Sequence, residues 1–470
     1  MRPKRRSPPT IPLPPEGLND TIAAIATPLG LGGIGVVRLS GPMAEAIAGR
    51  RFRPRRPRPR LLSHRLYLGH FLDAHGRVID EVLLTVMRAP HSYTREDVVE
   101  IHCHSGPQVL KEILAGLLQE GARLARPGEF TLRAFLSGRL SLSQAEAVLE
   151  VIEARSTAAL RVAQEHLAGG LGQRLAAAQQ VLFRVLARVE AALDFPEEAE
   201  EVAPEALAAE LAPVAANLAR LTATYREGRL LKEGVRAVLA GRPNVGKSSL
   251  LNRLLEEERA IVTDIPGTTR DLIEEAVSWQ GVLVRLTDTA GLREAGDRVE
   301  ELGIARTEER LASADVILYL VDHSQPLSAE DRRRLAELSG RQGLTVVNKI
   351  DLPRGLEEDE LAQISPFPQV RLSALTGQGV EELKARIVAA VLEGGVPATG
   401  EVITQARHHE HLKAAVASLE AALGHLKGAP AWELVAEDLR SAREELGRLT
   451  GETAADDLLE EIFSRFCIGK

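Results

Sequence analysis

A glycine-rich segment followed by lysine and serine is the part of the sequence best suited to bind phosphate. Residues 241–248 have the sequence Gly-Arg-Pro-Asn-Val-Gly-Lys-Ser and follow an apolar run at 237–240 that predicts a buried strand. The glycines let backbone N–H groups curl around phosphate oxygens, Lys247 brings a positive charge to the β and γ oxygens, and the Ser248 hydroxyl suits Mg²⁺. A helix beginning near Lys247 adds the positive end of its dipole. The segment therefore predicts a nucleotide phosphate site.

Two further motifs follow in the order expected of a guanine-nucleotide site. Asp288-Thr-Ala-Gly291 comes after a predicted strand at 282–287, which places Asp288 in the magnesium shell and the N–H of Gly291 against the γ-phosphate. In Asn348-Lys-Ile-Asp351, the Asp351 carboxylate can accept from the N1–H and the exocyclic amine of guanine. Adenine lacks that amine, so ATP would leave a buried carboxylate unpaired. The ordered set predicts GTP.

Two more segments, at 263–271 and at 373–375, complete the predicted nucleotide site, and one expected group is missing. Residues 263–271 form a predicted switch segment whose Thr269 joins the magnesium shell when γ-phosphate is present. Leu292 stands where Ras-like proteins carry the glutamine that orients water, so another group must organise hydrolysis. The predicted GTP contacts are Asn244, Val245, Gly246, Lys247, Ser248, Ser249, Thr263, Asp264, Ile265, Pro266, Gly267, Thr268, Thr269, Asp288, Thr289, Ala290, Gly291, Asn348, Lys349, Asp351, Ser373, Ala374 and Leu375.

Composition limits the class of protein. A chain of 470 residues with 44% hydrophobic residues predicts two to four packed domains. Its net charge of −8 excludes a globally basic nucleic-acid coat, so RNA contact would need a local basic patch. Two distant cysteines, Cys103 and Cys467, predict a reducing, cytoplasmic location. No apolar run reaches the length of a membrane span, and we expect the basic, proline-rich residues 1–18 to be a disordered tail.

Hydrophobic patterning divides the chain into three parts that position these motifs. Residues 19–135 mix strand-like runs at 82–87 and 98–101 with a helix at 107–121, an α+β pattern. A capping box at Ser143–Glu146 then opens a helical part, in which Gly169-Gly170 separates two helices and the second ends at Asp194. A third helix begins near Pro204.

The chain is helical again after about residue 401. Helices on both sides of an intact nucleotide-binding module predict its insertion into one discontinuous helical domain, which is tolerated when the inserted termini lie close together. The expected fold is an α+β domain at 19–135, an all-α domain at 136–231 and 397–470, and an inserted α/β domain at 232–396.

Two short motifs favour structural roles. The glycines at 30, 32 and 35 match a dinucleotide fingerprint, but the residues that follow predict a strand, so no helix N-terminus would receive a phosphate. His102-Cys103-His104 has the residue types of a zinc site, yet neighbours in a strand point to opposite faces and no second ligand pair follows.

Two other features can each be interpreted in more than one way. The Arg/Pro-rich residues 50–60 are typical of a solvated connector and are also suited to an auxiliary RNA contact. Cys467 has the residue type of a nucleophile, but a lone cysteine without an adjacent base is more often a small buried hydrophobic residue; we favour a pocket-lining role over that of a covalent catalyst.

Motifs along almost the whole chain resemble the MnmE (TrmE) family of tRNA modification GTPases, which form 5-carboxymethylaminomethyluridine. In the nucleotide module these are Asn244, the sequence Thr-Asp-Ile-Pro-Gly-Thr-Thr-Arg-Asp at 263–271, and Asp-Thr-Ala-Gly-Leu-Arg-Glu at 288–294. Outside it, the resemblance rests on segments 21–28, 30–41, 93–104, 125–130 and 142–147, and on the terminal Phe-Cys-Ile-Gly-Lys at 466–470.

The resemblance implies a specific activity. Members act with MnmG, a partner that uses FAD and NADH, and add an aminomethyl or carboxymethylaminomethyl group to C5 of the wobble uridine of tRNA. The added carbon comes from 5,10-methylenetetrahydrofolate, for which 5-formyltetrahydrofolate is an analogue. The implied architecture is a tetrahydrofolate-binding-like N-terminal domain, a helical domain and an inserted Ras-like P-loop G domain. A homodimer and a heterotetramer with MnmG are also implied.

The resemblance also assigns residues to the cofactors. The folate contacts fall on Arg38, Glu100, Arg139 and Lys470, with lysine in many relatives where this chain has Arg139. The Mg²⁺ ligands fall on Ser248 and Thr269. A potassium ion takes the place of an arginine finger when two G domains meet, and its ligands fall on Asn244, Thr263, Ile265 and Thr268.

Glu300 aligns with the acidic residue that orients water, so Glu300 and Lys247 are the expected catalytic residues. A switch GTPase that assists ribosome assembly, without folate chemistry, is the alternative, because similar G-domain motifs occur there. An aminomethyltransferase acting on a protein is less consistent with an inserted G domain.

Overall fold

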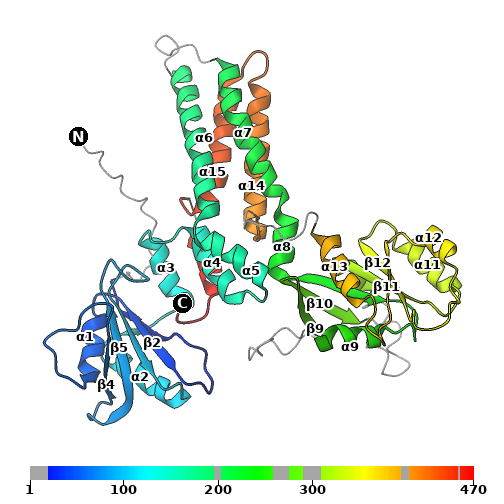
Figure 1. Ribbon diagram of the computed structural model, residues 1–470. Helices are drawn as coiled ribbons and strands as arrows, with labels where there is room; N and C mark the ends of the chain where they lie inside the picture. The colour runs from blue at the N-terminus through cyan, green and yellow to red at the C-terminus, as the bar shows by residue number, and fades with distance from the viewer. Residues whose placement is uncertain (1–18, 195–202, 258–274, 289–307, 393–401, 454–455) are drawn as a thin grey trace, which may run out of the picture. The chain divides into compact units, whose positions relative to one another are not determined.

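The computed structural model describes residues 19–194, 203–257, 275–288, 308–392, 402–453 and 456–470. Within these ranges the chain divides into two compact units, each assembled from segments far apart in the sequence (Figure 1). The first unit contains the described parts of Met1–Leu149, His166–Ala208 and Ala421–Lys470. The second contains those of Glu150–Glu165 and Ala209–Glu420.

The first unit contains a mixed sheet whose strands lie in the order β3-β4-β5-β6-β2-β1-β7. Neighbouring strands are antiparallel except β1 and β7, which are parallel. The strands are β1 Ile22–Ile25, β2 Gly35–Ser40, β3 Phe52–Pro54, β4 Leu66–Leu72, β5 Val78–Met87, β6 Val98–Cys103 and β7 Arg123–Leu124. The predicted strands at 82–87 and 98–101 are therefore confirmed, as is a strand after Gly35.

The two central strands of this sheet have one buried and one polar face. In β2, Val37 and Leu39 are fully buried and alternate with the partly exposed Arg38. The antiparallel register of β2 and β6 places Arg38 directly opposite Glu100. Two helices, α1 (Ala44–Arg51) and α2 (Pro107–Gln119), pack against the sheet, and α2 begins with proline at its first position. The sheet thus brings a cation and an anion together on one face.

The remaining helices of the first unit come from both the middle and the end of the chain. α6 packs along α15, and Arg440 of α15 forms an ion pair with Glu190 of α6 at 2.9 Å. α6 begins at Gly170 and ends at Asp194, which is the predicted end of this helix. The helices are α3 Glu129–Leu136, α4 Leu142–Glu153, α6 Gly170–Asp194, α15 Trp432–Thr450 and α16 Asp456–Ser464.

The predicted capping box of α4 is wrong by two residues. The reciprocal hydrogen bonds are formed by Ser141 and Gln144, not by Ser143 and Glu146. The Ser141 N–H donates to the Gln144 side-chain oxygen at 2.9 Å, and the Gln144 N–H donates to the Ser141 hydroxyl at 3.3 Å. The sequences Ser141-Leu-Ser-Gln144 and Ser143-Gln-Ala-Glu146 overlap, and both fit the capping-box motif. The first of the two marks the start of the helix.

The second unit is an α/β module. Its strands lie in the order β13-β12-β11-β8-β10-β9, and only β9 is antiparallel to its neighbour. Every residue of β11 and β12 is buried, as expected when helices cover both faces of a parallel sheet. The strands are β8 Val235–Ala240, β9 Glu275–Trp279, β10 Val282–Asp288, β11 Val316–Asp322, β12 Gly343–Asn348 and β13 Gln369–Arg371.

Helices lie within this module and also before and after it in the sequence. Those within the module are α9 Lys247–Glu257, α11 Ala329–Glu337, α12 Glu358–Ile364 and α13 Val380–Val391. Those before and after it are α5 Thr157–Leu167, α7 Pro204–Ala223, α8 Tyr225–Glu233 and α14 Ala406–His425. α7 begins at Pro204, as predicted. None of the described helices combines the length and apolar character needed to cross a lipid bilayer.

The segment that leads into the sheet contacts the segment that leaves it. The Ile403 N–H donates to the Thr224 hydroxyl at 3.1 Å. Glu150 accepts hydrogen bonds from the Thr404 hydroxyl at 2.7 Å and from Gln405 at 2.6 Å. The two chain crossings therefore lie close together, which is the geometry that insertion of a domain requires. The domain boundaries given above stay a prediction.

Replacement of Gly228 by alanine tests this contact. Gly228 lies in α8, and a Cβ there would overlap the carbonyl oxygen of Ile403. Because the obstacle is backbone, we expect Gly228→Ala to destabilise the protein by about 1–3 kcal/mol. Gly49→Ala in α1 is the control, since a Cβ there meets nothing within 4 Å and alanine favours helix. Thermal unfolding should show a lower midpoint only for Gly228→Ala; an unchanged midpoint would contradict the close contact.

Candidate functional site

The glycine-rich loop leaves the C-terminal end of β8 and turns directly into α9. Gly246 has a φ of +98°, and a Cβ at this position would overlap the side-chain amide of Asn348. Asn244 also lies in the left-handed region, with a φ of +66°. α9 begins at Lys247, so the first-turn N–H groups of the helix point toward the loop. This is the backbone arrangement that binds a phosphate anion.

Lys247 and Ser248 begin α9 and face different partners. The buried Lys247 ammonium donates to the carbonyl oxygens of Gly241 at 2.7 Å and Arg242 at 2.8 Å, which holds its charge over the loop. The Ser248 hydroxyl donates to a carboxylate oxygen of Asp288 at 3.0 Å. Asp288 ends β10, which pairs with β8 in parallel, so the sheet brings the two oxygen ligands together. A hydroxyl beside a carboxylate suits Mg²⁺, which prefers oxygen ligands.

Asn348 joins three loops at the C-terminal edge of the sheet. Its buried side-chain amide donates to the Val245 carbonyl at 2.9 Å and accepts from the Ala374 N–H at 3.0 Å. It therefore fixes the phosphate loop against the segment that contains Ser373, Ala374 and Leu375. Ser373 is buried, whereas Leu375 is 75% exposed.

Lys349 forms a second connection to the same loop. Its ammonium donates to the Asn244 carbonyl at 2.7 Å and to a carboxylate oxygen of Asp322 at 2.6 Å. Burial raises the pKa of Asp322, but hydrogen bonds from Lys349 and Ser324 outweigh it, so the pKa lies below its ordinary value. The ion pair therefore holds Lys349 in place at neutral pH. Asp322 was not among the predicted site residues, although its position at the end of an apolar strand is a usable signal.

Only some of the predicted nucleotide contacts lie in the part of the chain that the structure describes. Asp351 is exposed at the end of its motif, and Ser249 is exposed on the first turn of α9. The other predicted contacts lie outside the described residues; they are Thr263, Asp264, Ile265, Pro266, Gly267, Thr268, Thr269, Thr289, Ala290, Gly291 and Glu300. The structure thus assembles the phosphate loop, Asp288 and the Asn348 motif, and leaves the switch segment and Glu300 as predictions.

A second cluster lies on the polar face of the first unit's sheet. The Arg38 guanidinium contacts the Glu100 carboxylate through two nitrogens, both at 2.8 Å. A third contact runs from Arg38 to the carbonyl oxygen of Gly469 at 3.2 Å. The two side chains keep 17% and 19% of their surface exposed, so the pair is accessible but partly desolvated. Such a pair can present both an anion and a cation to a ligand.

Tyr93 connects Arg139 to this cluster. The Arg139 guanidinium lies 4.8 Å from the centre of the Tyr93 ring and donates to the Tyr93 carbonyl at 2.9 Å. Arg38 lies 5.8 Å from the same ring and 5.7 Å from the ring of Phe130. Neither aromatic residue was predicted as a site residue, because their contacts join distant parts of the chain. Together they give the cluster an aromatic wall.

The C-terminal residues close the cluster from another side. The Phe130 N–H donates to the Lys470 carbonyl at 3.2 Å, and Ile468 forms a backbone bridge with Pro127. Burial lowers the pKa of Lys470 below its ordinary value, and nearby Arg38 lowers it further, while Glu100 opposes both. All four predicted folate residues are therefore brought together, although they come from both ends of the chain.

Four residues of the first unit bear on the alternatives given above. Cys467 is exposed, so the alternative of a small buried hydrophobic residue is wrong. Cys103 is buried, and burial raises the pKa of its thiol to about 11. His102 lies 3.3 Å from Glu100, whereas His104 is hydrogen-bonded to Asp80 at 2.8 Å. The two histidines thus have separate carboxylate partners.

Removal of the Asn348 side chain tests its role in joining the loops. Asn348→Ala leaves the Val245 carbonyl and the Ala374 N–H without their partner, and unsatisfied buried groups cost about 1–3 kcal/mol each. We expect lower stability of the module and loss of nucleotide binding. The control is Asn252→Ala on α9, a substitution outside these loops. Fluorescent guanine-nucleotide titration measures the effect; equal affinity in both variants would contradict the role.

Known protein families match segments from both units of the chain. Residues 142–467 match the family described as the MnmE helical domain, and residues 21–139 match the GTP-binding protein TrmE N-terminus. The tRNA modification GTPase MnmE of Chloroflexus aurantiacus is 49% identical over 455 residues, covering 96% of this chain and 100% of that protein. MnmE of Symbiobacterium thermophilum is 50% identical over 463 residues, covering 96% and 99%.

A solved structure is similar to part of this chain. The G domain of the T. maritima FeoB iron transporter is 29% identical, covers 34% of this chain and 99% of that chain, and has a TM-score of 0.26. The relatives and both family matches extend far beyond the nucleotide module, into the helices and the N-terminal sheet. With about half of its residues identical to those of MnmE proteins along nearly its whole length, the chain belongs to the MnmE family of tRNA modification GTPases.

Proposed function

We propose that this chain is a GTP hydrolase that, with an FAD-dependent MnmG partner, modifies C5 of the wobble uridine of tRNA. The product carries an aminomethyl or carboxymethylaminomethyl group whose carbon comes from methylenetetrahydrofolate. The Arg38–Glu100 pair, closed by the Gly469 carbonyl from the far end of the chain, carries this proposal. A switch GTPase without folate chemistry would need only the nucleotide module and would have no use for this cluster.

The nucleotide chemistry is assigned to the loops at the edge of the second unit's sheet. Lys247 would release its loop carbonyls and contact the β and γ oxygens, where its charge stabilises the transition state. Ser248, beside Asp288, and Thr269 would hold Mg²⁺, which neutralises phosphate charge when bound. Asp351 selects guanine through two hydrogen bonds.

Potassium is assigned the charge-neutralising role of an arginine finger. Asn244 is exposed at the tip of the loop, with its carbonyl held by Lys349, so its side chain is accessible to a ligand. Thr263, Ile265 and Thr268 are the other proposed ligands. When bound, a monovalent cation would supply positive charge that offsets the negative charge developing on the phosphates. Glu300 then orients the attacking water in place of the missing glutamine at Leu292.

The cluster around Arg38 is assigned to the folate. The Glu100 carboxylate can accept hydrogen bonds from the amino and ring N–H groups of a pterin. Lys470, Arg38 and Arg139 supply cations that suit a glutamyl tail, and Tyr93 offers an aromatic face. An arginine at position 139 keeps the charge of the lysine found in relatives but offers a planar fork instead.

The proposal includes the assembly. We infer a homodimer through the N-terminal domain, a heterotetramer with MnmG, a tRNA substrate and a cytoplasmic location. Domains at 19–135, at 136–231 with 397–470, and at 232–396 complete the scheme. Nucleotide-dependent closure of two G domains would reposition the helices that lead toward the folate cluster and so couple hydrolysis to modification.

Mass spectrometry of wobble nucleosides tests the proposed function. Cells that lack this gene should lose the modified uridine, and the wild-type gene should restore it. A complementing Asp351→Asn gene should fail, because the variant no longer recognises GTP. Unchanged nucleosides together with an altered profile of ribosomal subunits would instead support the ribosome-assembly alternative.

The choice of salt tests the potassium site. An arginine finger accelerates hydrolysis about 10³–10⁵-fold, and we expect a smaller but still large acceleration from potassium. Steady-state GTP turnover should be fast in KCl and slow in NaCl at equal ionic strength. Glu300→Ala should bind GTP normally yet turn over poorly in KCl, whereas the exposed control Glu309→Ala should behave as wild type. Equal turnover in the two salts would remove the potassium assignment, and normal turnover by Glu300→Ala would remove Glu300.

A further inference from the structure

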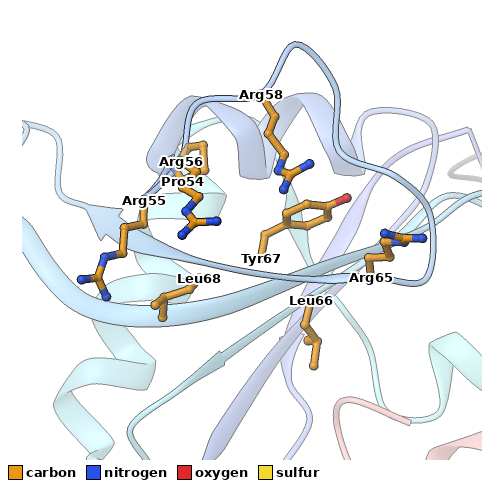
Figure 2. A pocket seen from close by; sticks show the side chains of 8 residues that line it. All are labelled: Pro54, Arg55, Arg56, Arg58, Arg65, Leu66, Tyr67 and Leu68. Carbon is orange, nitrogen blue, oxygen red and sulfur yellow. The ribbon is translucent and has the colours of Figure 1, made fainter.

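An open hollow lies beside the edge of the N-terminal sheet, on the side formed by β3 and β4. Figure 2 shows the side chains of Arg55, Arg56, Arg58 and Arg65, all from the connecting segment between β3 and β4 (residues 55–65), together with the ring of Tyr67. The hollow has a volume of about 440 Å³. It is lined by Pro54, Arg55, Arg56, Arg58, Arg65, Leu66, Tyr67 and Leu68.

The hollow is strongly and uniformly positive. No aspartate or glutamate stands in the sequence between Glu45 and Asp73, whereas eight arginines do. The four lining arginines are exposed, and none of them forms an ion pair with any part of the chain that the structure describes. Elsewhere in the same unit arginines have carboxylate partners, such as Glu120 for Arg51 and Glu45 for Arg88. The positive charge is therefore left for an external anion.

The connecting segment is held at several points, so the arginines are presented by an ordered frame. The Arg55 N–H donates to the Leu68 carbonyl at 2.9 Å, and the Leu62 N–H donates to the Tyr67 hydroxyl at 2.7 Å. Arg88 donates to the Leu61 carbonyl at 2.8 Å. The Arg58 guanidinium lies 5.8 Å from the centre of the Tyr67 ring. Prolines within the segment further restrict its backbone, which lowers the entropy lost on binding.

We propose that this arginine hollow binds the phosphate backbone of RNA, and of the tRNA substrate in particular. Guanidinium groups match phosphate oxygens in two-point contacts, which suits them to a nucleic-acid backbone. Leu66 and Leu68 flank the charges with exposed apolar surface that suits the sugars between phosphates. Because the whole chain carries a net charge of −8, attraction to RNA must come from a local surface of this kind. The choice of tRNA rests on the proposed function.

The test compares the salt dependence of tRNA binding by full-length variants. In the hollow variant, Arg55, Arg56, Arg58 and Arg65 are all replaced by glutamine. In the charge-matched control, four other arginines are replaced by glutamine. They are surface arginines of the second unit that are paired with glutamates: Arg332, Arg333, Arg334 and Arg386. Fluorescence anisotropy with labelled tRNA gives the dissociation constant at several salt concentrations, for the chain alone and with its flavoprotein partner. GTP turnover and circular dichroism verify folding.

Each lost phosphate contact should reduce the slope of log affinity against log salt by about 0.7–0.9, or about 3 for four contacts. We expect this reduction and weaker binding only in the hollow variant, with GTP turnover unchanged. A hollow variant that binds tRNA with the wild-type salt slope would overturn the proposal. So would a wild-type chain that binds no tRNA at low salt, either alone or with its flavoprotein partner. A variant that loses its protein partner but keeps the tRNA slope would also overturn it and indicate an acidic protein surface.

The outcomes separate this inference from the proposed function. Normal tRNA binding by the hollow variant, together with loss of the modified uridine in deletion cells, would remove the RNA surface and leave the enzyme assignment intact. Reduced tRNA binding by the variant, with modified uridine retained in deletion cells, would support the RNA surface and remove the enzyme assignment.

Discussion

The return of the C-terminus to the N-terminal sheet is the constraint on which the proposed chemistry depends. Arg38 bridges the Glu100 carboxylate and the Gly469 carbonyl, and the Lys470 carbonyl accepts from Phe130. A ligand that uses Glu100 and Lys470 together therefore senses both ends of the chain. Everything between them, including the nucleotide module, lies within a closed loop of polypeptide. In the proposed function, this connectivity is the route by which movement of the intervening helices would change the cluster.

The nucleotide module depends on a second, more local constraint. Loops at the C-terminal edge of a parallel sheet meet one another, and here buried polar side chains fix their positions. Asn348 holds the phosphate loop and the Ala374 segment, while Lys349 joins the same loop to Asp322. These residues are therefore as much part of the loop's architecture as of base recognition. Their removal should therefore disturb phosphate binding through the position of the loop.

The sequence predicts the parts that depend on local pattern. The glycine-rich loop, the strands before it and before Asp288, and the helix beginning at Pro204 all follow from residue type and period, and the structure contains them. Contacts between distant segments are harder to predict, because periodicity carries no information about them. The pairing of Arg38 with Glu100 depends on strand order, and the contact of Tyr93 with Arg139 spans 46 residues. The capping box of α4 forms at Ser141 and not at the predicted Ser143, because two overlapping sequences both fit the capping motif. The exposure of Cys467 likewise follows from the path of the last residues rather than from its type.

Calorimetric titration of the full-length chain with 5-formyltetrahydrofolate tests the central claim most directly. The account predicts that the wild-type chain binds this reduced folate. Glu100→Gln should weaken binding about 10-fold or more, since a hydrogen bond to a charged group contributes about 1.5–3 kcal/mol. Lys470→Ala should also weaken it, whereas Glu81→Gln, an exposed glutamate on the neighbouring β5, should not. Failure of the wild-type chain to bind reduced folate, or wild-type affinity in both Glu100→Gln and Lys470→Ala, would contradict a pterin pocket built from the two ends of the chain.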